Sequence, residues 1–140
     1  MILLVRHASA GDRELWEGDD SERPLDERGL RQAGEIVELL SGFEPTTIVS
    51  SPALRCLQTI GPLAESLDVP IEIRQELSEE RQFDEGAAFV ASLAGGAVVV
   101  CGHGGLEQLV LGHTAPRWRK GTTFVLDDDL RLVEKVRPSK

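Results

Sequence analysis

Three basic side chains, Arg6, His7 and His103, stand at or just beyond the ends of apolar runs of the sequence. A fourth, Arg55, is expected in the first turn of the helix that follows another short strand. Each of them could be structural by itself, because single histidines are often simply half-buried. Together they fit phosphoryl transfer, in which the charge on the oxygens of the transferred group requires fixed positive donors. The planar fork of a guanidinium binds two phosphate oxygens at once, and an imidazole can act as a nucleophile.

The strands that must position these side chains are predicted from the same apolar runs. Residues 1–5 and 97–101 are apolar without alternation, which is typical of strands buried on both faces of an α/β sheet. The β-branched residues 46–50 predict another short strand. Because loops at the carboxyl ends of parallel strands open a crevice, we expect the four basic side chains to converge there.

Helices are predicted between these strands. Asp26 is expected to cap the helix over 26–41, and Ser51 the next helix, with Pro52 at its first position. The apolar residues expected to face the core are Leu30, Ala33, Val37 and Leu40, then Leu54, Leu57, Gly61, Ala64 and Leu67. The remaining expected elements are a strand at 71–73, helices at 83–94 and 104–112, and a terminal antiparallel hairpin at 122–136. The alternation predicts a three-layer α/β/α sandwich around a mostly parallel central sheet.

Length and composition indicate an ordinary globular chain. The 140 residues, 41% hydrophobic and 28% charged, predict a single domain over 1–140. No apolar stretch is long enough to span a bilayer and the first residues do not resemble a signal peptide, so a cytoplasmic location is expected. The net charge of −9 disfavours nucleic acid and anionic membranes as partners, although a small anionic substrate responds to local charge. Cys56 and Cys101 are expected to be buried free thiols.

Competing chemistries lack their motifs. Neither cysteine is followed by an arginine at the spacing of a cysteine phosphatase, and no Walker A, Gly-x-Ser-x-Gly or dinucleotide-binding pattern occurs. A metal site built from His7, His103 and His113 is disfavoured, because the neighbouring arginines repel a divalent cation. We therefore expect no metal and no cofactor.

Three sequence motifs, in order and at suitable separations, resemble the signature of the histidine phosphatase superfamily. They are Arg6-His7-Ala8, Ser51-Pro-Ala-Leu-Arg55-Cys-Leu-Gln-Thr59 and Gly102-His103. The short length and the segment 23–29 are similar to small SixA-type phosphohistidine phosphatases. Segments 18–21 and 117–122 also resemble the phosphatase half of two-domain Nudix plus histidine-phosphatase proteins, although this chain has no Nudix motif. The resemblance implies a phosphoglycerate mutase-like fold.

The resemblance also implies roles for the strand-end residues. His7 would be the nucleophile that becomes phosphorylated, while Arg6, Arg55 and His103 would hold the phosphoryl oxygens. A nucleophilic histidine must be neutral with one ring nitrogen free, so its other N–H should be held, for example by a backbone carbonyl. His103 would serve best as a cation, so the two imidazoles are asked to take opposite charge states.

Departures from the family pattern leave the roles of some site residues undecided. Ala8 replaces the usual Gly after the nucleophile, and Arg13 stands where many members have Asn. The general acid of the family follows a Leu-x-Glu pattern that Leu77-Ser78-Glu79 satisfies, with Glu80 as the neighbouring candidate. Glu79 could equally be a solvated surface carboxylate, because charge runs usually are.

Two further residues, Arg23 and Lys120, are candidates for the phosphate pocket alongside Arg13. The capping insertion of phosphoglycerate mutases is missing, which disfavours mutase activity because a mutase must keep water from its intermediate.

These observations predict a cofactor-independent phosphatase that works through a phosphohistidine on His7. Its expected partner is a phosphorylated protein, as for a SixA-like phosphohistidine phosphatase, or a small phosphorylated metabolite. A nucleotide phosphatase is an alternative, and a phosphate-binding module without turnover is an alternative of another class. Turnover is favoured because another arginine would bind an anion better than His7 does.

Overall fold

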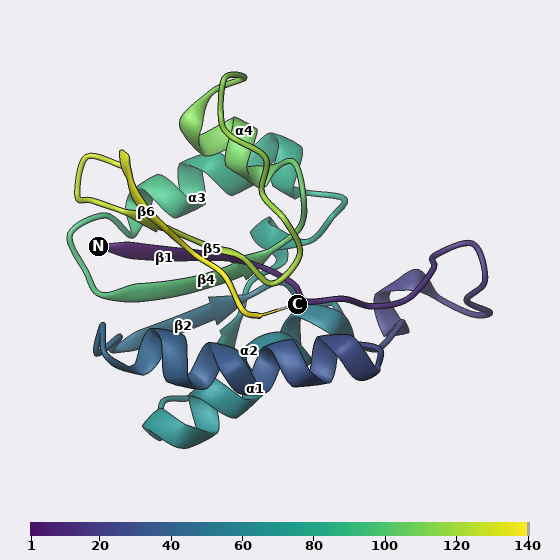
Figure 1. Cartoon of the computed structure of the whole chain (residues 1–140). Helices are drawn as coiled ribbons and strands as arrows, with labels where there is room; N and C mark the ends of the chain where they lie inside the picture. The colour runs from purple at the N-terminus through teal and green to yellow at the C-terminus, as the bar shows by residue number, and fades with distance from the viewer. Residues whose placement is uncertain (140) are drawn as a thin grey trace.

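The computed structural model describes residues 1–139 and contains one six-stranded sheet of order β3-β2-β4-β1-β5-β6 (Figure 1). The four strands from β3 to β1 are parallel, and β5 and β6 continue the sheet in antiparallel pairing. The strands are β1 (Ile2–Arg6), β2 (Thr47–Ser50), β3 (Ile71–Ile73), β4 (Val98–Gly102), β5 (Thr123–Leu126) and β6 (Leu132–Val136). The mostly parallel sheet and the terminal hairpin are as predicted.

Helices cover both faces of the sheet and complete the three predicted layers (Figure 1). On one side lie α1 (Glu27–Ser41) and α2 (Leu54–Leu67), and on the other lie α3 (Ala87–Ser92) and α4 (Leu106–Leu111). Three short helical turns, η1 (Asp20–Glu22), η2 (Gln75–Leu77) and η3 (Gln82–Gly86), lie in the connections.

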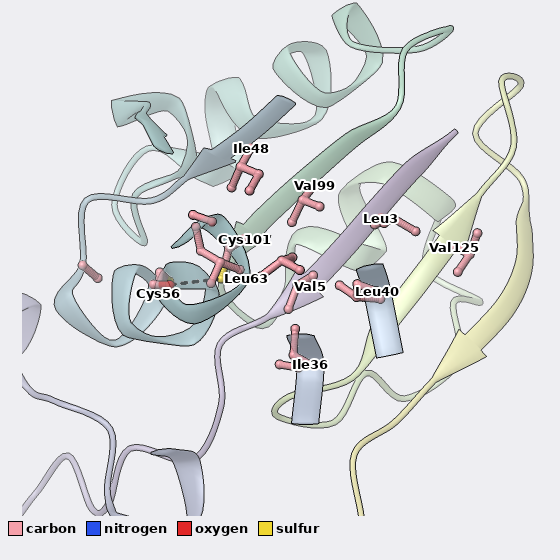
Figure 2. Packing of buried hydrophobic residues seen from close by; sticks show 13 residues of the cluster. Leu3, Val5, Ile36, Leu40, Ile48, Cys56, Leu63, Val99, Cys101 and Val125 are labelled. Carbon is pink, nitrogen blue, oxygen red and sulfur yellow. Dashed lines mark hydrogen bonds between the residues drawn. The ribbon is translucent and has the colours of Figure 1, made fainter. Parts of the chain in front are cut away.

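The apolar run of β1 is unbroken because both of its faces are buried. Leu3 and Val5 pack in the core between the sheet and the helices α1 and α2, which Figure 2 shows from close by. Ile2 and Leu4 point to the other core, beneath α3 and α4. All four side chains are fully buried, so the hydrophobic effect acts on each of them and the strand has no polar face.

The central strands end level with one another. Arg6 of β1 pairs with Gly102 of β4, and Ser50 of β2 pairs with Cys101. The loops that follow all three strands therefore leave the sheet at one edge, as the sequence predicts. The loop after β1 projects beyond this edge before the chain returns to α1 (Figure 1).

Two helix predictions are wrong in part. Asp26 caps α1 as expected, through its side chain and the Gly29 N–H, but Leu30 is 54% exposed. The helix α2 begins at Leu54 and not at Pro52, so its N-cap is Ala53, which makes no side-chain cap bond. The Ser51 hydroxyl lies outside the helix, where it contacts His103 and accepts from the Ala53 N–H at 3.2 Å. The buried residues of α2 are Arg55, Cys56, Thr59, Ile60, Leu63 and Ala64, so among the predicted inward residues only Ala64 is buried.

The helix predicted to begin at Phe83 begins later, at Ala87. Residues 82–86 form a wider π-helical turn, and Phe83 is 60% exposed. Cys56 and Cys101 are buried and free, as predicted. Within residues 1–139, no helix combines the length and the apolar character that crossing a membrane requires.

Candidate active site

The backbone around His7 is fixed from three sides. The His7 N–H donates to the Gly102 carbonyl at 3.1 Å, and the Ala8 N–H donates to the Thr59 hydroxyl at 2.9 Å. The carbonyls of Arg6 and His7 both accept from the Gly121 N–H at 3.1 Å. The end of β1 therefore has little freedom, which suits a side chain that must meet a reacting atom in one orientation.

The start of α1 holds the next part of the loop. The Asp26 carboxylate accepts from the Ser9 hydroxyl at 2.7 Å, from the Gly11 N–H at 3.0 Å and from the Gly29 N–H at 2.8 Å. A Cβ on Gly29 would lie 1.9 Å from the Ser9 carbonyl oxygen, so only glycine allows the helix to lie this close to the loop. Through these contacts the segment 23–29 holds the loop after β1 in place beside His7.

The His7 imidazole is buried and oriented by a backbone carbonyl. Its Nδ1 lies 2.8 Å from the Ala8 carbonyl oxygen, and the side chain is 4% exposed. A carbonyl only accepts, so this contact requires a proton on Nδ1 and leaves the lone pair on Nε2. Burial, followed by the nearby His103, Arg55 and Arg6, outweighs the Ala8 bond and lowers the pKa of His7 to about 3. At neutral pH His7 is thus an uncharged imidazole with a free nitrogen.

His103 is buried beside it in a different setting. The two rings are arranged edge to face, with centroids 5.5 Å apart. His103 Nε2 lies 2.8 Å from the Ser51 hydroxyl and 3.7 Å from the Cys56 sulfur. Its Nδ1 is buried and makes no hydrogen bond within residues 1–139. This nitrogen is available to a bound group.

Arg6 and Arg55 also have buried nitrogens without a partner in the described residues. Arg6 donates from Nη1 to the Trp118 carbonyl at 2.7 Å, whereas its Nε is unpaired. Gly104 covers the Arg6 guanidinium so closely that a Cβ would lie 3.0 Å from it. Arg55, 1% exposed, also has an unpaired Nε. Buried donors without acceptors are costly, and the oxygens of a phosphoryl group would satisfy them.

Two carboxylates neutralise part of this positive charge. Glu79 accepts from Arg13 Nη2 at 2.7 and 3.0 Å, and it lies 3.4 Å from Arg55 Nη2. Asp20 lies 2.9 Å from Arg23 and 3.1 Å from Arg55. Burial opposes the ionisation of Asp20, but Arg23, Arg55 and Arg13 outweigh it and lower the pKa of this carboxyl.

All of the predicted site residues line one or the other of two adjoining cavities at the carboxyl edge of the sheet. One cavity, of about 270 Å³, is lined by Arg6, His7, Gly11, Arg13, Arg23, Glu79, Gly104 and Lys120. Arg55, Glu80 and His103 line the second, of about 310 Å³, and Glu79 reaches both. The structure thus brings together every residue that the sequence singles out for the site, with Glu80 only at the second cavity.

Three residues were missed as site residues by the sequence analysis. Asp20 pairs with the arginines, Ser51 contacts His103, and Thr59 links the Ala8 N–H to the Arg55 carbonyl, to which its hydroxyl donates at 2.6 Å. Ser51 and Thr59 lie inside the recognised motif 51–59. Their hydroxyls, on a segment expected to be buried, could have indicated that they bond to other site residues. Asp20 lies in the segment 18–21, which resembles part of a known family, but among the acids of this loop no pattern marked Asp20 as a site residue.

The arrangement suits an anion. Within residues 1–139, no group of three or more His, Cys, Asp or Glu side chains could hold a metal ion. A neutral imidazole nitrogen surrounded by guanidinium groups is an arrangement that can attack phosphorus while the phosphoryl oxygens stay bound.

Known proteins are similar to this chain in sequence. The family model described as the histidine phosphatase superfamily (branch 1) matches residues 2–85. A Mycolicibacterium smegmatis protein described as 8-oxo-(d)GTP phosphatase is 38% identical over 139 residues, which cover 89% of this chain and 43% of the relative. The chain therefore spans less than half the length of that relative.

Solved structures agree in fold. The protein histidine phosphatase SixA complexed with tungstate superposes with a TM-score of 0.78 at 24% identity, covering 97% of this chain and 96% of the other. The putative phosphohistidine phosphatase SixA from Nakamurella multipartitia superposes with a TM-score of 0.71 at 26% identity, covering 99% and 96%. The predicted fold class is confirmed by this similarity over nearly the whole chain.

Proposed function

The chain belongs to the histidine phosphatase superfamily, and from this premise we propose that it hydrolyses its substrate through a covalent phosphohistidine on His7. The observation that supports the proposal most directly is the neutral His7 imidazole, held at Nδ1 by the Ala8 carbonyl among cationic groups. Such a nitrogen is a nucleophile at neutral pH without needing a base.

The reaction takes two steps. His7 Nε2 attacks phosphorus, the bond from phosphorus to the leaving group breaks, and the bonding electrons depart with the leaving group. Arg6, Arg55 and His103 hold the phosphoryl oxygens during the transfer. Water then attacks the phosphohistidine, which releases inorganic phosphate and restores the neutral imidazole.

The surroundings of Glu79 bear on the leaving group. Both of its oxygens accept hydrogen bonds from arginine, so in this geometry Glu79 acts as an acceptor for Arg13 and Arg55 and is not placed to donate a proton to a leaving group. An alkoxide needs such a proton as it leaves, whereas an imidazole or a phosphate leaves with little help. The site is therefore best suited to substrates of the latter kind.

Two substrate classes meet this condition. One is phosphohistidine in a protein, as in the SixA proteins that the chain resembles in fold and length. The other is a nucleotide phosphoanhydride, a class favoured by the relative described as 8-oxo-(d)GTP phosphatase.

The covalent step is tested by trapping. Brief incubation with a labelled phosphoryl donor should give an acid-labile, alkali-stable adduct that maps to His7. A label on another residue would contradict the mechanism. Tight binding of phosphate with neither adduct nor turnover would identify a binding module instead.

The leaving-group preference is tested with Glu79→Gln, and Glu80→Gln is measured alongside because Glu80 is the other candidate for the general acid. If Glu79 donates no proton, the variant should hydrolyse serine phosphate, an aryl phosphate and phosphohistidine with similarly small losses. If Glu79 is the general acid, it should lose about a hundredfold on serine phosphate alone. That outcome would extend the activity to ordinary phosphomonoesters.

A further inference from the structure

A basic groove adjoins the cavity of His7. It has a volume of about 390 Å³ and is lined by Arg6, Ser9, Arg28, Gln32, Arg117, Arg119 and Lys120. Arg6 and Lys120 also line the cavity of His7, so the two hollows adjoin at these side chains. The groove thus begins where the phosphoryl site ends.

The charge of the groove contrasts with the rest of the chain. The protein carries 24 acidic and 15 basic side chains, yet no carboxylate lines the groove. None of its five cations forms an ion pair within the described residues, whereas Arg13, Arg23 and Arg55 all do. Gathered like charges repel one another, and a bound anion would relieve this repulsion.

Buried contacts hold one wall of the groove in place. Trp118 is buried, its indole donates to the Thr122 carbonyl at 2.9 Å, and its own carbonyl accepts from Arg6. This anchor fixes the segment that carries Arg117 and Arg119 on either side of the tryptophan. Burial, together with the nearby Arg6 and Arg23, lowers the pKa of Lys120, which is consistent with crowding of positive charge at the junction of the two cavities.

We propose that the basic groove binds a second phosphate, joined to the one that His7 accepts, so that the preferred substrate is a compact phosphoanhydride such as a nucleoside diphosphate. This inference rests on the proposed function and selects between its two substrate classes. Every lining side chain is polar or charged, so the groove offers an acidic peptide no apolar contact, while guanidinium groups suit a dense cluster of phosphate oxygens.

The chemistry follows from the same geometry. His7 Nε2 attacks the terminal phosphorus, the bond to the bridging oxygen breaks, and its electron pair stays on that oxygen. The departing group is a phosphate monoester dianion, which the groove stabilises and which needs no proton from Glu79. Water later cleaves the phosphohistidine, and both of its protons end on the inorganic phosphate.

The test compares ligands with one and two phosphates in the double variant Arg117→Gln/Arg119→Gln. Calorimetry should show the wild type binding methylenediphosphonate, which cannot be hydrolysed, at least about tenfold more tightly than inorganic phosphate. The double variant should lose most of this ratio. Arg131→Gln, which removes an exposed charge from the opposite edge of the sheet, should keep it.

Kinetics provide the second readout. For the double variant, kcat/KM should fall at least about tenfold more for a nucleoside diphosphate than for p-nitrophenyl phosphate. Equal falls of kcat/KM for the two substrates, or an unchanged ratio of the two binding affinities, would contradict the proposal that the groove binds the second phosphate. A larger fall for a phosphohistidine protein than for the diphosphate would assign the groove to protein docking and overturn the proposal too. If no adduct forms on His7, the proposed covalent mechanism is contradicted. The binding comparison still tests the groove, because it needs no turnover.

Discussion

The ends of β1 and β4 lie side by side and each delivers a buried histidine, yet the two imidazoles are held by opposite kinds of partner. His7 faces a backbone carbonyl, which only accepts, so its Nδ1 must keep a proton. His103 faces the Ser51 hydroxyl, which can donate or accept, and its other nitrogen is unpaired within residues 1–139. The first ring is therefore locked in a single tautomer, whereas the partner of the second ring does not fix its tautomer.

The difference shows how one edge of a sheet supports two roles for the same residue type. The carbonyl beside His7 belongs to the next residue, so the orientation of the ring is built into the local chain. The hydroxyl beside His103 comes from the end of another strand, so the setting of that ring depends on the β2–β4 pairing. The two strand ends should therefore respond differently to substitution.

The largest expected effect separates the two histidines. His7→Ala should lower phosphatase activity by about four orders of magnitude or more, because the nucleophile is lost. His103→Ala should lower kcat by about a hundredfold, because an oxygen-binding donor is lost. Only the His103 variant should still form the labelled adduct. Equal activities, or an adduct in the His7 variant, would show that the roles are assigned wrongly.

Removing Arg55 tests a guanidinium that acts on His7 and lines the same cavity as His103. Arg55→Ala should lower kcat/KM by about a hundredfold, since a charged donor aimed at the transferred group contributes about 3 kcal/mol in the transition state. Arg74→Ala is a matched control, because Arg74 is paired with Glu76 and neither residue lines either cavity. A loss below about threefold for Arg55→Ala would place the side chain outside the reaction.

The charge state of His7 is tested through stability. Its pKa is 6.5 without the protein surroundings and about 3 when folded, so between these values only the unfolded chain takes up the proton. The free energy of unfolding should therefore fall as the pH drops from about 6.5 towards 3, by about 1.4 kcal/mol per pH unit from this group alone. Above pH 6.5 it adds no pH dependence.

Denaturant titrations of the wild type and His7→Gln at several pH values check this expectation. The variant should show a shallower fall, because glutamine does not titrate. Parallel curves would mean that the folded protein protonates His7 as readily as the unfolded chain does.

The smallest expected effect comes from the hydroxyl beside His103. Ser51→Ala should lower kcat about fivefold, the value of one neutral hydrogen bond of about 1 kcal/mol, and should leave adduct formation on His7 intact. Ser50→Ala is the control, because Ser50 is a neighbouring buried serine whose hydroxyl donates to the Ser51 carbonyl and, within residues 1–139, makes no hydrogen bond to His103. A similar loss in both variants would attribute the effect to packing of β2 instead of to His103.

The sequence by itself determined the strand ends and the residues that they carry. Unbroken apolar runs require burial on both faces, and such strands in α/β order place Arg6, His7 and His103 at one edge. Asp26 was recognisable as a helix cap because capping is local, involving residues within one turn of the chain.

Only the tertiary structure decided which groups meet across long stretches of chain. Ser51 looked like a cap but contacts His103, and Arg55 lies on the buried face of α2 because Asp20 and Glu79 come to it from other segments. The basic groove joins Arg28 of α1 to residues 117–120, far apart in sequence. Such pairings depend on how the layers pack, and no local pattern of residues encodes them.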